Sequence, residues 1–204
     1  MPKNISYGTW SSPITSESLV QESIGLGDIF TNGEQSYWLE MRPSEDGRYV
    51  LVTMNNKNEV VDLTPAPYNV RSRVHEYGGG AFTLSKDSIY FSNFTDQRIY
   101  KMEGDSENIF PISSDNDNYR YADFKIHENL NWLIAVKESH HHDMEPSNSL
   151  VAIDCNGSYL EKTLASGADF YSSPVTSPDE TKLAWIQWNH PNMPWDSISI
   201  TVRR

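Results

Sequence analysis

One segment of this 204-residue chain gathers the residue types that could do chemistry. Arg71-Ser-Arg-Val-His-Glu-Tyr-Gly-Gly-Gly80 combines two arginines, a histidine, a glutamate, a tyrosine and three consecutive glycines. Such residues could bind a metal, stabilise an oxyanion, hold an acidic ligand or cradle a phosphate. Each of these tasks needs further residues at a defined spacing, which the rest of the sequence either supplies or lacks.

The spacing of the histidines does not support a metal site. His75 and Glu76 are followed by Gly79 at the position where the helical zinc-protease pattern needs its second histidine. The tract His140-His-His-Asp-Met-Glu145 lies between two expected strands, and adjacent strand residues point to opposite faces. We interpret this tract as a polar hairpin loop, and we predict neither a metal nor another cofactor.

The sequence lacks the other residues that acyl transfer and phosphate binding require. Esterases present a His-Gly-Gly-Gly run, whereas Glu76 and Tyr77 here separate His75 from the glycines. The chain contains no Gly-x-Ser-x-Gly nucleophile elbow, so we predict no catalytic residue and no peptidase activity of the chain alone. A phosphate cradle needs a helix after the glycines, but Ala81-Phe-Thr-Leu84 is typical of a strand.

An architectural role or a ligand contact remains for this segment. In an extended strand Arg71, Arg73, His75 and Tyr77 would share one face. We favour pairing of this cationic face with carboxylates of a neighbouring blade of sheet, and the alternative is contact with an acidic group of a peptide. The candidate substrate contacts are Arg71, Arg73, His75, Glu76 and Tyr77. The glycines would allow a close backbone approach where a side chain would clash.

Composition excludes several classes of partner. The chain carries 28 Asp and Glu against 16 Lys and Arg, which argues against nucleic acid because phosphate binding needs a basic surface. No apolar run approaches the roughly 18 residues of a membrane span. The sequence also lacks the Lys/Arg cluster of membrane-binding segments and the apolar core of a secretory signal. Cys155 is the single cysteine, so no internal disulfide can form and we expect a cytoplasmic protein.

Short apolar segments recur along the chain. They begin at Tyr37, Ile89, Trp132 and Leu183 and are bounded by Gly, Pro, Asn, Asp or Ser, which is typical of strands and turns. Helical periodicity is scarce, with only Ser16–Ile24 faintly amphipathic. A period of about 40 to 50 residues that carries several strands indicates β-propeller blades, whereas a β-sandwich would show no such period.

The repeats predict an all-β fold, a partial β-propeller of about three and a half to four blades of four-stranded antiparallel sheet. We place the blades at about residues 10–66, 67–114, 118–166 and 169–204 of a single domain, 1–204. The fourth blade ends just after its expected third strand, Ile198-Ser-Ile-Thr-Val202. Because propellers typically have about four to eight blades, we interpret the chain as a fragment.

Such a fragment would expose the flanks of its first and last blades. Uncovered sheet edges and apolar flanks recruit other chains, so we expect self-association as a dimer. We expect Trp185, Trp188 and Trp195 to add exposed aromatic surface near the end of the chain.

Five segments together resemble a known family. They are Tyr7–Ile14, Tyr37–Pro43, Asn69–Phe82, Phe91–Arg98 and Trp185–Asp196. They look like the propeller of prolyl oligopeptidase-type serine peptidases, and most like the acylaminoacyl-peptidase or dipeptidyl-aminopeptidase-like branch. The resemblance extends over essentially the whole chain.

The resemblance implies a complete relative in which a full propeller is followed by an α/β-hydrolase domain with a Ser/Asp/His triad. In that relative the propeller gates and orients short peptide substrates. The hydrolase domain is absent from this sequence, so no triad residue carries over. One alternative is a self-associating or partner-binding scaffold module without a link to peptidase activity. Another is a free-standing propeller enzyme such as a lactonase, for which no recurring Glu or Asn supplies a metal ring.

Overall fold

The computed structural model describes residues 6–9, 12, 14–16, 23–33, 35–104 and 108–204. In this part the chain forms fifteen β-strands and one 3-10 turn, η1 (Pro43–Glu45), and no helix there is long and apolar enough to cross a membrane. Most of the faintly amphipathic segment Ser16–Ile24 lies outside the described residues.

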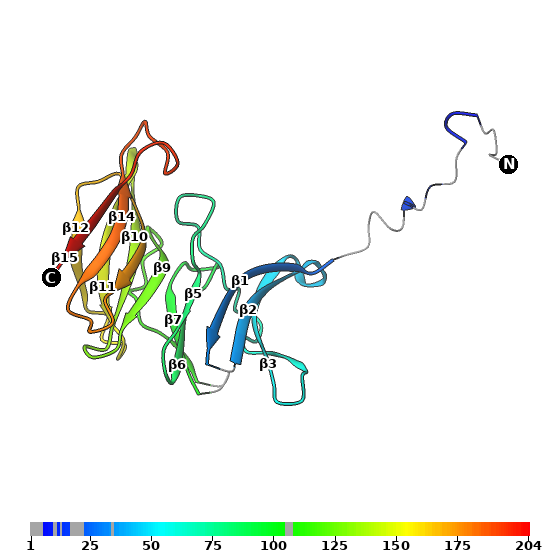
Figure 1. Cartoon of the computed structure of the whole chain (residues 1–204), viewed down its shortest axis with the longest axis horizontal. Helices are drawn as coiled ribbons and strands as arrows, with labels where there is room; N and C mark the ends of the chain where they lie inside the picture. Colours follow the sequence, from blue (N-terminus) through cyan, green and yellow to red (C-terminus); the bar gives the residue numbers. More distant parts are fainter. Residues whose placement is uncertain (1–5, 10–11, 13, 17–22, 34, 105–107) are drawn as a thin grey trace.

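The strands pair into four antiparallel sheets that follow one another in chain order (Figure 1). The first sheet holds β1 (Gly25–Asn32), β2 (Gln35–Arg42), β3 (Arg48–Met54) and β4 (Val60–Asp62). The second holds β5 (Phe82–Leu84), β6 (Ser88–Ser92), β7 (Ile99–Glu103) and β8 (Ile109–Pro111). The third holds β9 (Tyr119–His127), β10 (Trp132–His141), β11 (Met144–Asp154) and β12 (Glu161–Ser166). The fourth holds β13 (Phe170–Thr176), β14 (Leu183–Trp188) and β15 (Ser199–Arg203).

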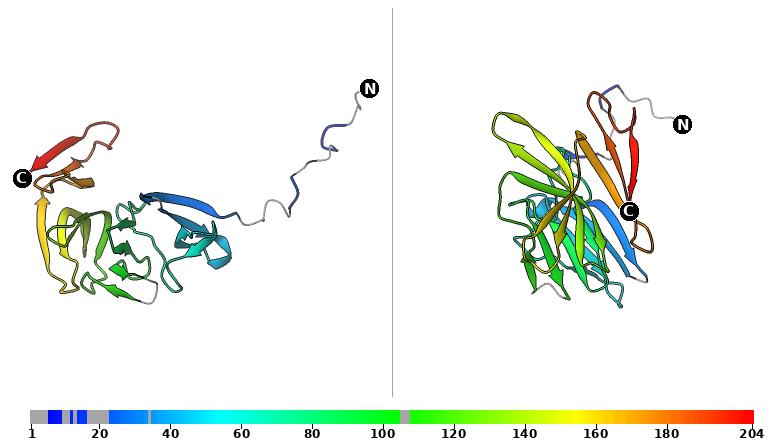
Figure 2. Two further views of the ribbon diagram at one scale, coloured as in Figure 1. Left: turned by 60° about the horizontal axis from the view of Figure 1, so that its bottom comes forward. Right: turned by 90° about the vertical axis from the view of Figure 1, so that its left-hand side faces the viewer.

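The first strands of the sheets lie beside one another. β1 contacts β5, β5 contacts β9, and β9 contacts β13. The left view of Figure 2 shows the sheets following one another in an arc. Meandering four-stranded sheets set around a common centre are the blades of a β-propeller, so the predicted fold class is confirmed.

Three apolar cores fill the junctions between successive sheets. The core between the second and third sheets includes Tyr90, Ile99, Ile112, Phe124, Leu133, Ala135, Val151 and Cys155. Alternate side chains of a central strand face opposite neighbours, since Leu133 and Ala135 join this core while Val136 joins the core shared with the fourth sheet. Central strands buried on both faces are therefore apolar almost throughout.

The tryptophans near the end of the chain differ from the prediction. Trp185 is 2% exposed and Trp188 is 6% exposed, and both belong to β14, the central strand of the fourth sheet. The Trp188 ring stacks on Phe170 with a centroid distance of 5.3 Å. Only Trp195, outside the strands, is strongly exposed, at 76%. The prediction of exposed Trp185 and Trp188 is therefore wrong, because Trp185 packs in the core shared with the third sheet and Trp188 packs against Phe170 and His75.

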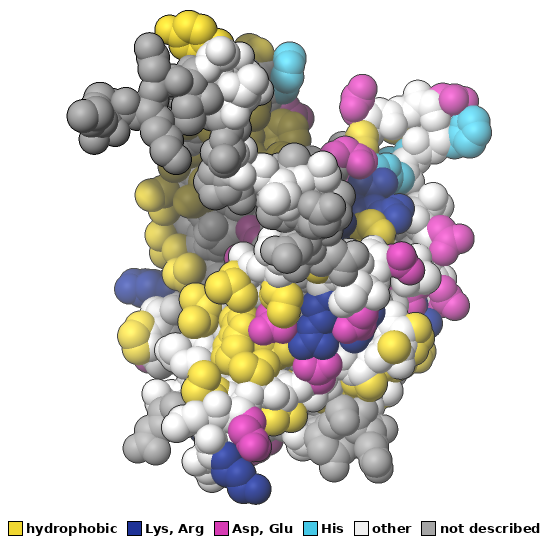
Figure 3. Space-filling model, turned by 90° about the vertical axis from the view of Figure 1, so that its right-hand side faces the viewer, with side chains coloured by type: hydrophobic (Ala, Val, Ile, Leu, Met, Phe, Trp, Pro, Cys, Tyr) yellow, Lys and Arg dark blue, Asp and Glu magenta, His cyan; other side chains and the backbone are white. Residues whose placement is uncertain are grey.

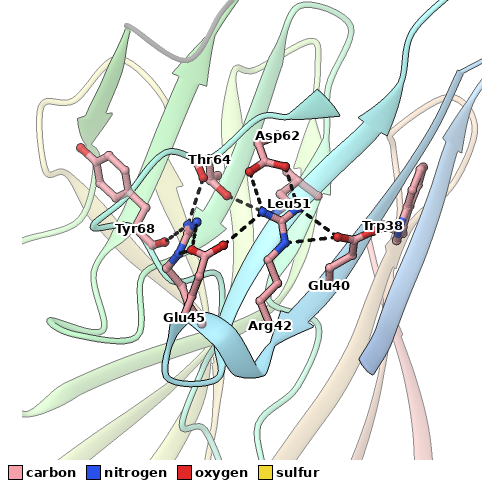
Figure 4. A network of polar contacts seen from close by, with 9 residues as sticks. Trp38, Glu40, Arg42, Glu45, Leu51, Asp62, Thr64 and Tyr68 are labelled. Carbon is pink, nitrogen blue, oxygen red and sulfur yellow. Dashed lines mark hydrogen bonds and ion pairs between the residues drawn. The ribbon is translucent and has the colours of Figure 1, made fainter. Parts of the chain in front are cut away.

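An ion-pair network joins strands of the first sheet (Figure 4). The Arg42 guanidinium donates two hydrogen bonds of 2.6 Å to Asp62 and one of 3.0 Å to Glu40. The bonds to Asp62 raise the pKa of Arg42, and in return they lower the pKa of Asp62. Arg48 donates to the carbonyl oxygen of Thr64 at 3.1 Å. These contacts fix the outer strand β4 against the body of the sheet.

Candidate functional site

The chain between the first and second sheets turns sharply at its middle. Arg71 N donates to Ser92 O at 3.1 Å, so the segment begins in an extended form. His75 and Glu76 then take positive φ angles of 55° and 65°. Because this turn interrupts the extended segment, the prediction that alternate side chains from Arg71 to Tyr77 share one strand face is wrong.

Arg71 and Arg73 lie against aromatic rings. The guanidinium carbon of Arg73 is 4.3 Å from the Phe94 centroid, and that of Arg71 is 4.9 Å from the same ring. Among the ion pairs of the described residues none includes Arg71 or Arg73. The favoured pairing with carboxylates of a neighbouring blade is therefore wrong for these two arginines, although His75 does lie 3.6 Å from the Glu138 carboxylate of the third sheet. Cation–π contacts worth about 0.5–1 kcal/mol at exposed sites take its place.

Gly79 and Gly80 allow the chain to pass directly against β9. A Cβ on Gly79 would meet Ala122 Cβ and Asp123 Oδ1 at 2.9 Å each, which leaves no room for a side chain. Gly80 N donates to Asp123 Oδ1 at 2.7 Å, and Ser173 N donates to Asp123 Oδ2 at 2.9 Å. One carboxylate thus links the inner backbone of the second, third and fourth sheets, and these glycines have an architectural role.

Glu138 on β10 is the buried centre of the polar groups beside this turn. Its side chain is 5% exposed, its Oε2 accepts a hydrogen bond of 2.8 Å from His75 N, and its Oε1 lies 2.6 Å from His140 Nε2. Burial alone would raise the pKa of Glu138, but the contacts from His75 and His140 outweigh it and lower the pKa to about 2. The carboxylate therefore stays charged at neutral and mildly acidic pH.

Arg120 on β9 connects Glu138 to the turn. Its Nη1 lies 2.6 Å from Glu76 Oε1 and 3.3 Å from Glu138 Oε1, and it donates to Arg73 O at 3.0 Å. Ligand atoms of Glu76, Glu138 and His140 lie within 4.8 Å of one another, a spacing that could suit a metal ion. Because the guanidinium already forms ion pairs with both carboxylates, we interpret the group as an ion-pair network.

A cavity of about 590 Å³ opens beside this network. The turn, the β10–β11 hairpin and the ends of the fourth sheet supply its lining: His75, Glu76, Glu138, Glu145, Pro146, Asn148, Asp169, Phe170 and His190. Four of these residues carry carboxylates, so the lining is acidic. One wall is apolar, since Phe170 stacks on Trp188 and makes an edge contact of 5.4 Å with the ring of His75.

Two buried polar atoms in the cavity lining have no hydrogen-bond partner. One is Oδ1 of Asn148, a residue that is 7% exposed and whose Nδ2 donates to Asp169 O at 2.8 Å. The other is Nδ1 of His75, which lies 3.6 Å from Glu138 Oε2. Buried polar groups are almost always paired, so an unpaired acceptor in a cavity wall points to a group that the cavity receives.

The predicted site residues divide between two places. His75 and Glu76 line the acidic cavity. Arg71 and Tyr77 line a smaller cleft of about 170 Å³ between the first and second sheets, and Arg73 lines neither space. The five candidates therefore do not form one site.

Sequence reasoning missed Glu138, Asn148 and Phe170. They come from three different strands, and Glu138 is 63 residues from the backbone N–H that it accepts. The one signal in the sequence was Glu138 itself, because it is a carboxylate within the largely buried strand β10. Alternation along that strand could have marked it as facing inward.

Solved structures show what this arrangement resembles. A Mycobacterium tuberculosis puromycin-hydrolysing peptidase matches with a TM-score of 0.87 and 32% identity, over 98% of this chain and 33% of its own. A puromycin hydrolase matches with a TM-score of 0.86 and 26% identity, over 98% of this chain and 33% of its own. The chain thus spans about a third of the length of these peptidases, and the resemblance to the propeller portion of prolyl oligopeptidase-type peptidases is confirmed.

More distant structures share the fold alone. An oligogalacturonate lyase from Vibrio parahaemolyticus matches with a TM-score of 0.60 at 11% identity, and TolB from Acinetobacter baumannii with 0.56 at 11%. No family model and no curated protein matches the sequence.

Proposed function

We propose that this chain is the propeller part of a serine peptidase that acts on short peptides, and that it gates and orients the substrate without carrying catalytic residues. The observation that carries this proposal is the match to a puromycin-hydrolysing peptidase at 32% identity over 98% of the chain. A likeness in sequence across nearly the whole chain goes beyond what a shared fold alone would produce.

The acidic cavity supports a role in substrate binding. Sites for small ligands are concave and combine an apolar wall with a few polar groups that orient the ligand. Phe170 supplies such a wall, and Glu76 and Asn148 supply polar groups around the same space of about 590 Å³. A short peptide has both the backbone polar groups and the side chains that this lining can receive.

The chemistry would reside outside the propeller. In the complete protein a hydrolase domain would carry the Ser/Asp/His triad, and we place its specificity in the acylaminoacyl-peptidase or dipeptidyl-aminopeptidase-like range. The proposed location is the cytoplasm, because the single cysteine, Cys155, is buried and free, as is usual in a reducing compartment.

Peptide binding by the chain itself tests the proposal. We expect isothermal titration calorimetry to show saturable binding of short peptides and no heat of hydrolysis. Glu145→Trp would place a bulky ring at the cavity and weaken this binding. The matched control is Asp143→Trp, on the same hairpin but outside the cavity lining. Absence of peptide binding, or equal binding by both variants, would contradict the proposed role.

A second candidate function, self-association through uncovered blade flanks, rests on a different observation. Leu26 and Ile29 on β1 are 77% and 66% exposed, and Ile200 and Val202 on β15 are 71% and 58% exposed. Figure 3 shows hydrophobic side chains gathered on the side of the molecule that carries the first sheet. We propose that a second copy of the chain covers these strands when the rest of a propeller ring does not.

A further inference from the structure

We infer that the groove between the third and fourth sheets is a binding site for a small amphipathic carboxylate, a ligand with an apolar body and one carboxylate group. The groove shares none of its described lining residues with the acidic cavity. The inference therefore goes beyond the proposed function, and peptide binding at the acidic cavity neither requires it nor excludes it.

The walls of the groove continue the apolar core between these two sheets. Trp185 belongs to that core, Leu164 and Leu183 pack against it, and all three line the groove together with Trp132. Leu164, Leu183 and Trp132 are only half-buried, so a ligand that covers them would remove apolar surface from water. The groove has a volume of about 420 Å³, and small-molecule sites usually measure about 300–1,000 Å³. A small apolar body therefore fits this space.

Four basic side chains line the same groove. They are Lys162, Lys182, Arg203 and Arg204. None of them takes part in the ion pairs of the described residues, although the chain has 28 acidic against 16 basic residues. Cations that lack a carboxylate partner beside apolar surface favour a ligand that brings a carboxylate.

The acidic side chain of the lining is engaged by other groups. Among the described residues that line the groove, Glu180 carries the only carboxylate. Its Oε1 accepts a hydrogen bond of 2.8 Å from Glu128 N, and its Oε2 accepts one of 2.9 Å from Asn129 N. Oε2 also lies 3.1 Å from His127 Nδ1. Because both oxygens are bound to the turn after β9, the negative charge that would pair with the basic side chains has to come from a ligand.

Two of the basic side chains lie over aromatic rings of the groove. Lys162 Nζ is 4.8 Å from the ring centroid of Trp132, and Arg203 Cζ is 5.7 Å from that of Trp185. Arg203 Nη1 donates a hydrogen bond of 2.9 Å to Leu164 O, which ties β15 to β12, the strand that carries Lys162. A guanidinium has five N–H donors, so Arg203 keeps donors for a carboxylate after this bond. Positive charge thus lies directly beside ring surface, and an amphipathic acid matches both.

A second copy of the chain matches the groove less well. Side chains alternate along β15, so Ile200 and Val202, which we propose for self-association, face away from Arg203 and the groove. A peptide with a free amine also matches less well, because its positive charge would meet the four basic side chains. A small carboxylate meets neither objection.

The test compares two probes with the same apolar body, 4-phenylbutanoate and its neutral amide, 4-phenylbutanamide. Isothermal titration calorimetry on the whole chain is expected to show at least about fivefold tighter binding of the carboxylate. The double variant Lys162→Gln/Lys182→Gln is expected to remove most of this preference, because it keeps polar side chains but removes two charges. The matched control is Lys57→Gln/Lys86→Gln, in turns of the first and second sheets outside the lining, and it should keep the preference.

The other possible outcomes would overturn the inference. Equal binding of both probes would show that the groove does not select a carboxylate. Absence of binding by both probes would remove the site, and a preference that survives in Lys162→Gln/Lys182→Gln would place the anion elsewhere. If the groove instead receives a second copy, this variant would weaken a dimer seen by light scattering while neither probe binds. Circular dichroism of each variant establishes that it is folded.

Discussion

Replacing Gly79 by alanine is expected to destabilise the junction of the second and third sheets. The new Cβ would lie 2.9 Å from both Ala122 Cβ and Asp123 Oδ1. Carbon atoms in contact prefer separations of about 3.5–4.0 Å, so the backbone or both neighbours must move. One of these neighbours, the Asp123 carboxylate, accepts hydrogen bonds from Gly80 N and Ser173 N, so its displacement would loosen three sheets at once.

The size of the effect follows from these contacts. Overpacking in a well-packed interior costs about 1–3 kcal/mol. A hydrogen bond to a charged group contributes about 1.5–3 kcal/mol, and weakening one of the two to Asp123 adds part of that. For a chain of this size about 2–3 kcal/mol lowers the Tm by about 4–12 °C.

Thermal unfolding followed by circular dichroism measures this change. Ala122→Gly removes one of the two atoms that the new Cβ would meet. Gly79→Ala should therefore lower the Tm less when it is added to Ala122→Gly than when it is made in the unmodified chain. An unchanged Tm in Gly79→Ala would refute the close-approach argument. A loss that the second substitution does not reduce would also refute it.

Four further results are expected. Contacts from His75 and His140 lower the pKa of Glu138 from 4.5 to about 2. Its contribution of about 3 kcal/mol to the free energy of unfolding is therefore present above pH 4.5 and is lost as the pH falls toward 2. In urea unfolding, Glu138→Gln should lack this decrease in stability at acidic pH. By the same method, Arg73→Ala should lower the free energy of unfolding by only about 0.5–1 kcal/mol, because it removes a cation–π contact. A loss of about 3–5 kcal/mol, as for a broken buried ion pair, would show that Arg73 does more than make this contact. Light scattering should show a dimer that Ile200→Asp converts to monomer, and a monomeric starting protein would contradict self-association. The chain alone should not react with fluorophosphonate probes, and labelling of one serine per chain would contradict its lack of a nucleophile.

The fold could be predicted because the repeat of apolar segments coincides with central strands of the sheets. The apolar segments that begin at Tyr37, Ile89, Trp132 and Leu183 lie in β2, β6, β10 and β14, the second strand of each sheet. Each of these strands is hydrogen-bonded to a strand on both sides, and β6 and β10 also lie between two neighbouring sheets, so these positions favour apolar residues. The outer strands β4 and β8 have only three residues each, which is too short for a recognisable pattern in the sequence.

The candidate site was only partly predictable. His75 and Glu76 were found, but their positive φ angles were not, because non-glycine residues rarely adopt this conformation. The turn is held from outside, by the Glu138 carboxylate that accepts His75 N. A contact between residues so far apart in the chain leaves no pattern in a single sequence. The glycines were correctly assigned to close approach, but Asp123, the group they approach, had no sequence signal.

Hydrogen–deuterium exchange with and without the short peptide Phe-Gly-Gly amide tests most directly whether this propeller holds a peptide at the acidic cavity. The account predicts slower exchange at residues 75–78, 145–148 and 169–171, which surround the cavity. Unchanged exchange in these segments would contradict it. So would protection confined to the groove between the third and fourth sheets that Trp132, Lys162 and Trp185 line.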